Sequence, residues 1–99
     1  MKIFIDDCRK PYDDSWTLVK DSKSALELIV ANIDMVTAIS FDHDLGGDDT
    51  TRPVALWLEE QAITSGVKFP IATFIHSANP VGRIWLETSL YKSTCYSRS

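Results

Sequence analysis

Three short apolar segments each end directly at acidic or histidine side chains, and this repeated pattern constrains the fold more than any other feature. The apolar segments are residues 2–5, 36–41 and 69–75. The polar residues that follow them are Asp6, Asp7, Asp42, His43, Asp44, His76 and Ser77. Short continuous runs rich in β-branched and aromatic residues predict buried strands, and such runs are typical of parallel sheets.

Helix signals separate these strands. A further short strand is expected at residues 16–19. The predicted helices cover residues 23–32, 53–65 and 80–91. The residues expected to start or end these helices are Asp21 or Ser22, Pro53, Gly66 and Asn79-Pro80. Strands and helices in alternation predict an α/β fold, a mostly parallel sheet with right-handed crossovers and helices on both of its faces.

The length and the charge limit what the chain can do. Its 99 residues are enough for one domain, expected at residues 1–92, with a frayed tail at 93–99. The net charge is −4, and all ten aspartates lie in the first half. Non-specific binding to duplex nucleic acid needs a broad basic surface, so we do not expect duplex DNA or RNA as a partner.

The expected location is a reducing cytoplasm. Cys8 and Cys95 lie almost a chain length apart and form neither a disulfide framework nor a zinc pair. Because an acid next to a thiol raises its pKa, Cys8 is expected to be inert beside Asp7. No stretch approaches the ~20 apolar residues of a membrane span, and no signal peptide is visible, so we expect no membrane partner.

The strand-end residues predict one polar site. The carboxyl ends of parallel strands meet at one edge of a sheet, which is where ligands bind in such folds. Carboxylates gathered there repel one another unless a cation neutralises them, and Mg²⁺ or Mn²⁺ is the natural choice for oxygen ligands. The candidate metal ligands are Asp6, Asp7, Asp42 and Asp44.

Two families share parts of this pattern. Acids after the first strand (IFIDD) and a later one (SFDHD), with a hydroxyl residue after the next (FIHS), resemble a response-regulator receiver domain. A receiver, however, has a fifth strand carrying a lysine, and a helix between its first two strands. The motifs IFIDD-x-R-x-P, ISFDHDLG and HSANPVG more closely resemble the cyclic-phosphate-processing receiver-like family over residues 2–91.

The resemblance implies a fold and an activity. The fold is a receiver-like (flavodoxin-like) three-layer sandwich with a four-stranded parallel sheet in the order 2-1-3-4, three helices and no fifth strand. The implied activity is hydrolysis of a cyclic phosphate on a nucleotide or an RNA end, in RNA repair or in conflicts between phages and hosts. A phage-encoded chain would then be located in the host cytoplasm. The family's shared acidic and histidine positions match Asp6, Asp7, Asp42, His43, Asp44, His76 and Ser77, flanked by Arg9 and Asn79-Pro80.

Opening a cyclic phosphodiester needs a neutralised phosphate, an activated water and an acid for the leaving oxygen. His43 and His76 are candidates for base and acid, since imidazole titrates near neutrality. Asp42 is the third candidate catalytic residue. The candidate substrate-binding residues are Arg9, Ser77, Asn79 and Arg83. The two histidines would also serve in a mechanism without metal.

A different class of function stays open. The chain would then be a non-enzymatic receiver-like module that accepts phosphate on Asp42, or one that binds or sequesters a nucleotide signal without cleaving it. The missing receiver lysine argues against ordinary phosphotransfer, and two histidines at strand ends favour chemistry. Product analysis after incubation with cyclic nucleotides separates the alternatives.

Overall fold

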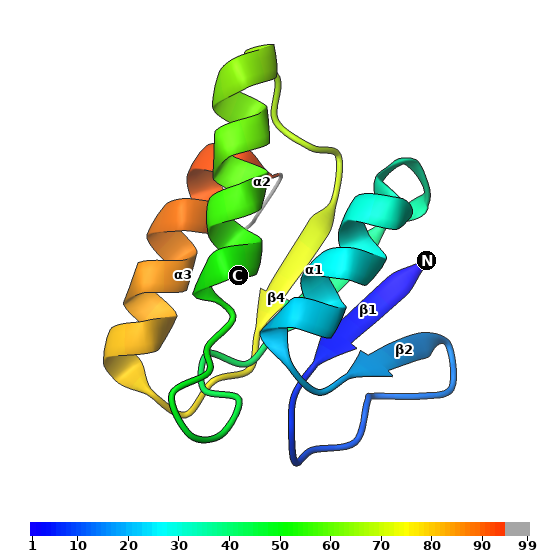
Figure 1. The fold of residues 1–99 in the computed structure, drawn as a ribbon, viewed down its shortest axis with the longest axis vertical. Helices are drawn as coiled ribbons and strands as arrows, with labels where there is room; N and C mark the ends of the chain where they lie inside the picture. Colours follow the sequence, from blue (N-terminus) through cyan, green and yellow to red (C-terminus); the bar gives the residue numbers. More distant parts are fainter. Residues whose placement is uncertain (95–99) are drawn as a thin grey trace.

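A computed structural model describes residues 1–94 and contains a four-stranded parallel sheet (Figure 1). The strands are β1 (Lys2–Ile5), β2 (Trp16–Val19), β3 (Ala38–Phe41) and β4 (Ala72–Ile75). The helices are α1 (Ser22–Ala31), α2 (Arg52–Ser65) and α3 (Pro80–Ser93), with a 3₁₀ turn, η1, at Ile33–Met35. The strand order is β2-β1-β3-β4, with every pair parallel, so the predicted order and the receiver-like α/β topology are confirmed.

The register of the sheet aligns the strand ends that carry the polar residues. Ile5 pairs with Phe41, and Phe41 pairs with Ile75. The residues that come next along each strand therefore start from the same edge of the sheet. This alignment places Asp6, Asp42 and His76 side by side in the order of their strands.

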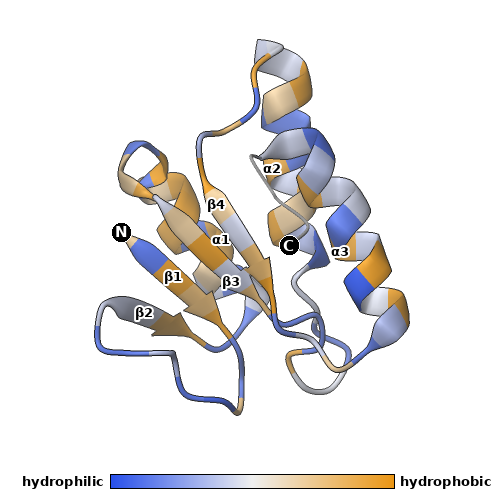
Figure 2. Ribbon diagram, turned by 180° about the vertical axis from the view of Figure 1, so that it is seen from behind, coloured by the Kyte–Doolittle hydropathy of each residue, from blue (hydrophilic) through white to orange (hydrophobic). Residues whose placement is uncertain are grey.

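All three helices lie on the same side of the sheet (Figures 1 and 2). Chain connections run β2 to β3 through α1 and β3 to β4 through α2, and both move in the same direction across the sheet. Right-handed crossovers in one direction put their helices on one face. The helix expected between the first two strands of a receiver has no counterpart here, because that connection is the loop 6–15. The expected third layer is therefore absent among residues 1–94.

The core fills the space between the sheet and the helices. Ile3, Ile5, Ile39 and Phe41 point from the central strands into this space and have no exposed surface. The helices contribute further fully buried side chains to the core: Ala25 and Ile29 from α1, Val54, Ala55 and Leu58 from α2, and Leu86 and Leu90 from α3. One continuous core holds the strand ends in place, which is the requirement for a rigid site.

Several element boundaries differ from the prediction for local reasons. Residues 33–35 form the 3₁₀ turn, so β3 starts at Ala38 rather than at residue 36. β4 starts at Ala72 rather than at residue 69, because Pro70 has no backbone N–H to donate to a neighbouring strand. Asp21 caps α1, accepting a 2.7 Å hydrogen bond from the Ser24 backbone N–H.

The third helix continues past its predicted end. It runs to Ser93, and both Ser93 and Thr94 are buried, so neither belongs to a frayed tail. The Thr94 hydroxyl lies 3.3 Å from that of Thr73, and Thr94 forms a bridge with Phe69 beside the start of β4. The rest of the predicted tail, 95–99, including Cys95, lies outside the described residues.

Helix α2 ends at Gly66, as predicted, and a single substitution tests this cap. Gly66 has a φ of 74°, and its backbone N–H donates to the Ala62 carbonyl oxygen. Because an L side chain disfavours left-handed backbone, Gly66→Ala is expected to lower the free energy of unfolding by about 1 kcal/mol. Chemical denaturation measures the change. Thr64→Ala, two residues earlier at an exposed position, is the control and should stay within about 0.5 kcal/mol of the wild type.

Candidate functional site

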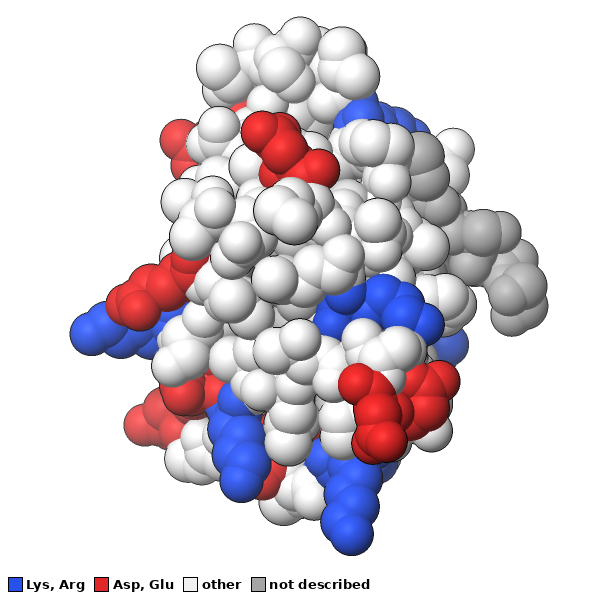
Figure 3. Space-filling model, turned by 90° about the vertical axis from the view of Figure 1, so that its right-hand side faces the viewer, with Lys and Arg blue, Asp and Glu red and all other residues white. Residues whose placement is uncertain are grey.

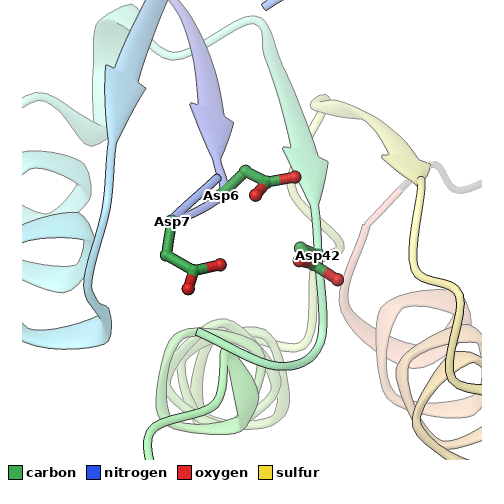
Figure 4. Close-up of side chains that lie close together, drawn as sticks. All are labelled: Asp6, Asp7 and Asp42. Atoms are coloured by element: carbon green, nitrogen blue, oxygen red, sulfur yellow. The ribbon is translucent and has the colours of Figure 1, made fainter. Parts of the chain in front are cut away.

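Three carboxylates meet at the carboxyl edge of the sheet (Figure 4). Asp6 and Asp7 directly follow β1, and Asp42 directly follows the neighbouring strand β3. Each of the three offers one oxygen, and these oxygens all lie within 4.8 Å of one another. The aligned register produces this cluster, because the Asp42 backbone N–H donates to the Ile5 carbonyl oxygen at 3.0 Å and extends the pairing past the strand ends.

Asp6 is the most tightly held of the three, with 1% of its surface exposed. One of its oxygens, Oδ1, accepts hydrogen bonds from the backbone N–H groups of Cys8 at 2.8 Å and Arg9 at 3.0 Å. Burial acts to raise the pKa of Asp6, but these two bonds and the bond from His76 outweigh it, so the pKa lies below its ordinary value. Asp6 is therefore an anion near neutral pH.

Asp42 has the opposite shift. Burial, followed by the negative charge of Asp6, raises its pKa above the ordinary value. Its Oδ1 accepts a 2.8 Å hydrogen bond from the His43 backbone N–H, which only partly offsets these effects. A positive charge bound between the carboxylates would remove the repulsion that raises this pKa. The electrostatics of the cluster thus favour a cation.

Asp7 approaches the loop after β3. Gly46 in that loop has a φ of 89°, and a Cβ atom there would lie 3.1 Å from Oδ2 of Asp7. Glycine therefore satisfies two requirements, a left-handed backbone and a close approach to a carboxylate. Gly46 thus combines a tight turn of the loop with a close backbone approach to Asp7.

His76 lies beside the carboxylates and connects them to the opposite face of the sheet. Its Nε2 is 3.0 Å from Oδ2 of Asp6, and its Nδ1 is 2.7 Å from the Ser40 hydroxyl oxygen, which in turn lies 3.0 Å from the Tyr12 hydroxyl. Burial lowers the pKa of His76, with Asp6 opposing the shift, so the ring is neutral near pH 7. An anionic Asp6 only accepts hydrogen bonds, so Nε2 carries the proton and Nδ1 accepts from Ser40.

The His43 ring occupies a different environment, although His43 directly follows Asp42. Its side chain is buried, with Nδ1 at 3.0 Å from Asp44 and Nε2 at 2.9 Å from Nε of Arg52. Since the arginine Nε–H only donates, Nε2 is the acceptor and Nδ1 carries the proton. The ring also packs against Gly82, where a Cβ atom would come within 2.3 Å of its Cγ. His43 thus joins the starts of α2 and α3.

Asp44 does not join the carboxylate cluster, in contrast to the sequence expectation. Its carboxylate accepts from His43 and, at 3.1 Å, from the Asn79 side-chain amide. The hydrogen bond from His43, and to a smaller extent the one from Asn79, holds the pKa of Asp44 below its ordinary value. β3 ends at Phe41 and Asp44 pairs with Thr50, so the backbone leaves the direction of the strand before Asp44.

The candidate substrate-binding residues surround the end of β4. Arg9 donates from its guanidinium to the His76 carbonyl oxygen, and Arg83 donates to the Ile75 carbonyl oxygen at 2.8 Å. Arg83 also pairs with Glu87 at 3.2 Å. Asn79 caps α3 by accepting from the backbone N–H groups of residues 81 and 82, at 3.1 and 3.2 Å, and its own N–H donates to the Ser77 hydroxyl. Of these residues, Arg9 and Ser77 lie closest in sequence to the carboxylates and His76.

Cys8 is exposed and unpaired. The charge of Asp7 raises its pKa most, followed by a hydrogen bond to the same carboxylate. A raised thiol pKa leaves little thiolate near neutral pH, which agrees with the prediction that Cys8 is inert.

The surface charges are mixed. On the side of the molecule seen in Figure 3, lysine and arginine side chains lie among aspartate and glutamate side chains around a largely uncharged centre. This side therefore carries no broad basic surface of the kind that binds duplex nucleic acid. Among residues 1–94, each helix is too short or too polar to cross a lipid bilayer.

The fold and the strand-end carboxylates define a receiver-like α/β domain. The chain belongs to the cyclic-phosphate processing receiver domain family, which it matches over residues 1–92. The family's name associates such domains with cyclic-phosphate processing. Neither the search of curated proteins nor that of solved structures found a match.

Sequence reasoning missed four residues that support the site. Tyr12 and Ser40 extend the hydrogen-bond chain of His76, while Arg52 and Gly82 hold His43. Ser40 gave a visible signal, because it is a polar residue inside an otherwise apolar strand segment. Tyr12 lies in a loop, where spacing gives no indication of the face that it covers.

Proposed function

We propose that the chain is a phosphodiesterase that hydrolyses a cyclic phosphate on a nucleotide or an RNA end, with Mg²⁺ or Mn²⁺ held by Asp6, Asp7 and Asp42. The observation that carries the proposal is the cluster of three carboxylates within 4.8 Å, with His76 bonded to one of them. Membership of a family named for cyclic-phosphate processing supports the same substrate class.

The carboxylates fit a hard divalent cation. Opposite ligands of Mg²⁺ lie about 4.2 Å apart, since each Mg–O bond is about 2.1 Å, so oxygens within 4.8 Å need only small side-chain adjustments. Asp42 and Asp7 are the more available ligands, because both oxygens of Asp6 already accept hydrogen bonds. When bound, the cation would polarise the phosphate and lower the pKa of a coordinated water.

The reaction exchanges one P–O bond for another. Water supplies the oxygen of the new P–O bond, the bond to one ribose oxygen breaks, and a proton moves from the water to that leaving oxygen. His76 is the candidate for this proton transfer at Nε2, the nitrogen on the Asp6 side, and Asp6 orients the ring. Arg9 lies beside His76 and supplies positive charge for a phosphate oxygen.

Incubation with a panel of cyclic phosphates tests the proposal. The panel contains 2′,3′-cyclic nucleotides, RNA with a 2′,3′-cyclic end and cyclic ADP-ribose-type phosphates, each with and without Mn²⁺. Chromatography should detect an opened phosphomonoester that increases with time and with Mn²⁺. The absence of an opened product from every compound would rule out the phosphodiesterase.

Cation binding has a separate thermal test. A ligand that binds only the native state at ten times its Kd adds about 1.4 kcal/mol, which for a chain of this size is a rise in melting temperature of roughly 6–11 °C. Mg²⁺ or Mn²⁺ should produce such a rise, and Asp7→Asn should remove most of it. Asp48→Asn is the matched control, since Asp48 is exposed and outside the carboxylate cluster.

Unchanged melting curves at millimolar Mg²⁺ and Mn²⁺ would contradict the cation part of the proposal. A product formed without metal would then assign the reaction to the histidines alone.

Binding without turnover is the second candidate function, and one observation favours it. Both ring nitrogens of His76 and of His43 are engaged in hydrogen bonds within the protein. A chain that captures a cyclic nucleotide without opening it needs no free imidazole nitrogen. Calorimetric binding of a cyclic nucleotide that is recovered intact would support this alternative over hydrolysis.

A further inference from the structure

The face of the sheet opposite the helices carries a cluster of rings instead of a helix. The cluster, here called the aromatic face, consists of Phe4, Tyr12, Trp16, Phe74 and His76. Tyr12 is 59% exposed and Phe74 is 47% exposed, whereas Phe4 is buried beneath its neighbours. Large aromatic side chains left open to solvent on one contiguous surface are typical of a binding site.

The rings of the aromatic face meet edge to face and do not lie in one plane. The Trp16 ring is 5.2 Å from that of Tyr12 and 6.2 Å from that of Phe74, measured between centroids. The interplanar angles are 72° and 76°, so Tyr12 and Phe74 each stand steeply against Trp16. A flat aromatic ligand can stack on an exposed ring while its edge meets a neighbouring ring.

The aromatic face is continuous with the carboxylate site through His76. The His76 ring stacks on Phe4, with 4.4 Å between centroids and 10° between planes, while its Nε2 contacts Asp6. Tyr12 reaches the same histidine through Ser40. A molecule with a phosphate at Asp42 and an aromatic group one sugar away would contact both surfaces.

Basic groups lie along the same face. The Lys2 ammonium is 5.1 Å from the centroid of the Trp16 ring, and Arg9 contacts the His76 carbonyl. Lys10 is exposed in the loop that joins β1 to β2. Of the acidic residues in this loop, Asp13 directs its carboxylate to Ser15. Rings flanked by cations suit a ligand that joins a base to phosphate, as in single-stranded nucleic acid recognition.

We propose that the aromatic face binds the nucleobase of the substrate, with Tyr12 and Phe74 as its stacking surfaces. The inference rests on the proposed function only for the position of the phosphate. If the aromatic face binds a base, the substrate is a nucleoside cyclic phosphate, either free or at the end of an RNA, and not a cyclic phosphate without a base.

Calorimetry with two ligands tests the inference without turnover. Adenosine 3′-monophosphate is a product type that the proposed reaction cannot consume, and ribose 5-phosphate lacks a base. With Mg²⁺ present, the wild type should bind the nucleotide at least 10-fold more tightly than ribose 5-phosphate. Tyr12→Ala and Phe74→Ala should each weaken nucleotide binding about 10-fold and leave the affinity for ribose 5-phosphate unchanged.

Two control variants separate the effect of losing an aromatic ring from other effects of substitution. Tyr12→Phe keeps the ring and removes the hydroxyl, so it should retain the wild-type affinity for the nucleotide. Ile84→Ala removes an exposed apolar side chain from α3, on the helical side of the molecule, and should have no effect. Equal affinity of the wild type for the two ligands, or unchanged nucleotide binding by both alanine variants, would overturn the inference.

Other results have distinct meanings. A dimer in analytical ultracentrifugation that Phe74→Ala dissociates would show that a second copy covers the face, and the inference would be wrong. Base-dependent binding without any opened cyclic phosphate would support the inference and reject the phosphodiesterase. Equal turnover of cyclic phosphates with and without a base would support the phosphodiesterase and reject the inference.

Discussion

His76→Ala is expected to lower the turnover of a cyclic nucleotide about 10²- to 10⁴-fold with little change in KM, because it removes a group that transfers a proton in the reaction. His76→Gln is the matched variant. Its amide keeps a hydrogen bond to Asp6 within reach but does not titrate, so it should be nearly as inactive while melting close to the wild type. Initial rates and thermal melts measured on the same preparations separate chemistry from stability.

His43→Ala provides the comparison. The sequence predicted equal roles for the two histidines, but the His43 ring packs against Gly82 and bonds to Arg52 and Asp44. Its removal should therefore lower the melting temperature more than His76→Ala does. A larger loss of turnover in His43→Ala than in His76→Ala, with both variants folded, would assign the proton transfer to His43 instead.

Gly82→Ala is expected to lower the free energy of unfolding by about 2 kcal/mol or more, a shift of roughly 8 °C or more in melting temperature. The new methyl group would lie within 2.3–2.7 Å of three atoms of the His43 ring, so the ring or the start of α3 must move. Chemical denaturation measures the loss.

Val81→Ala is the control for this change, because Val81 is exposed at the preceding position of α3. It should alter stability by no more than about 0.5 kcal/mol. A Gly82→Ala protein as stable as the wild type would show that the His43 ring is free to move, and would weaken the assignment of His43 to a packing role.

The sequence was sufficient to predict the residues that the strand ends bring together. Asp6, Asp42 and His76 each follow a short apolar strand, and the topology of a parallel sheet aligns such positions without any knowledge of side-chain packing. The strand order followed from the receiver resemblance, and the caps at Asp21 and Asn79 from local chemistry. These features depend on the backbone path or on residues close in sequence.

Features that depend on side-chain packing were missed. The strand-end pattern grouped Asp44 with Asp42 as a metal ligand, but β3 ends at Phe41 and Asp44 bonds to His43 and Asn79. The distribution of helices over the two faces was also wrong, although the predicted strand order and right-handed crossovers together place the crossover helices on one face. The role of Tyr12 depends on how the loop 6–15 covers the sheet, and sequence periodicity contains no such information.

Because helices cover only one side of the sheet, the substitutions that the chain tolerates differ between its two sides. Substitutions on the helical side of the sheet must preserve the volume and shape of a close-packed interior, since changes of even one methylene are costly there. Tyr12 and Phe74 on the other side meet solvent and can be replaced with much less repacking. The exposed aromatic residues can therefore vary among descendants of such a chain while the carboxylate edge and the core stay unchanged.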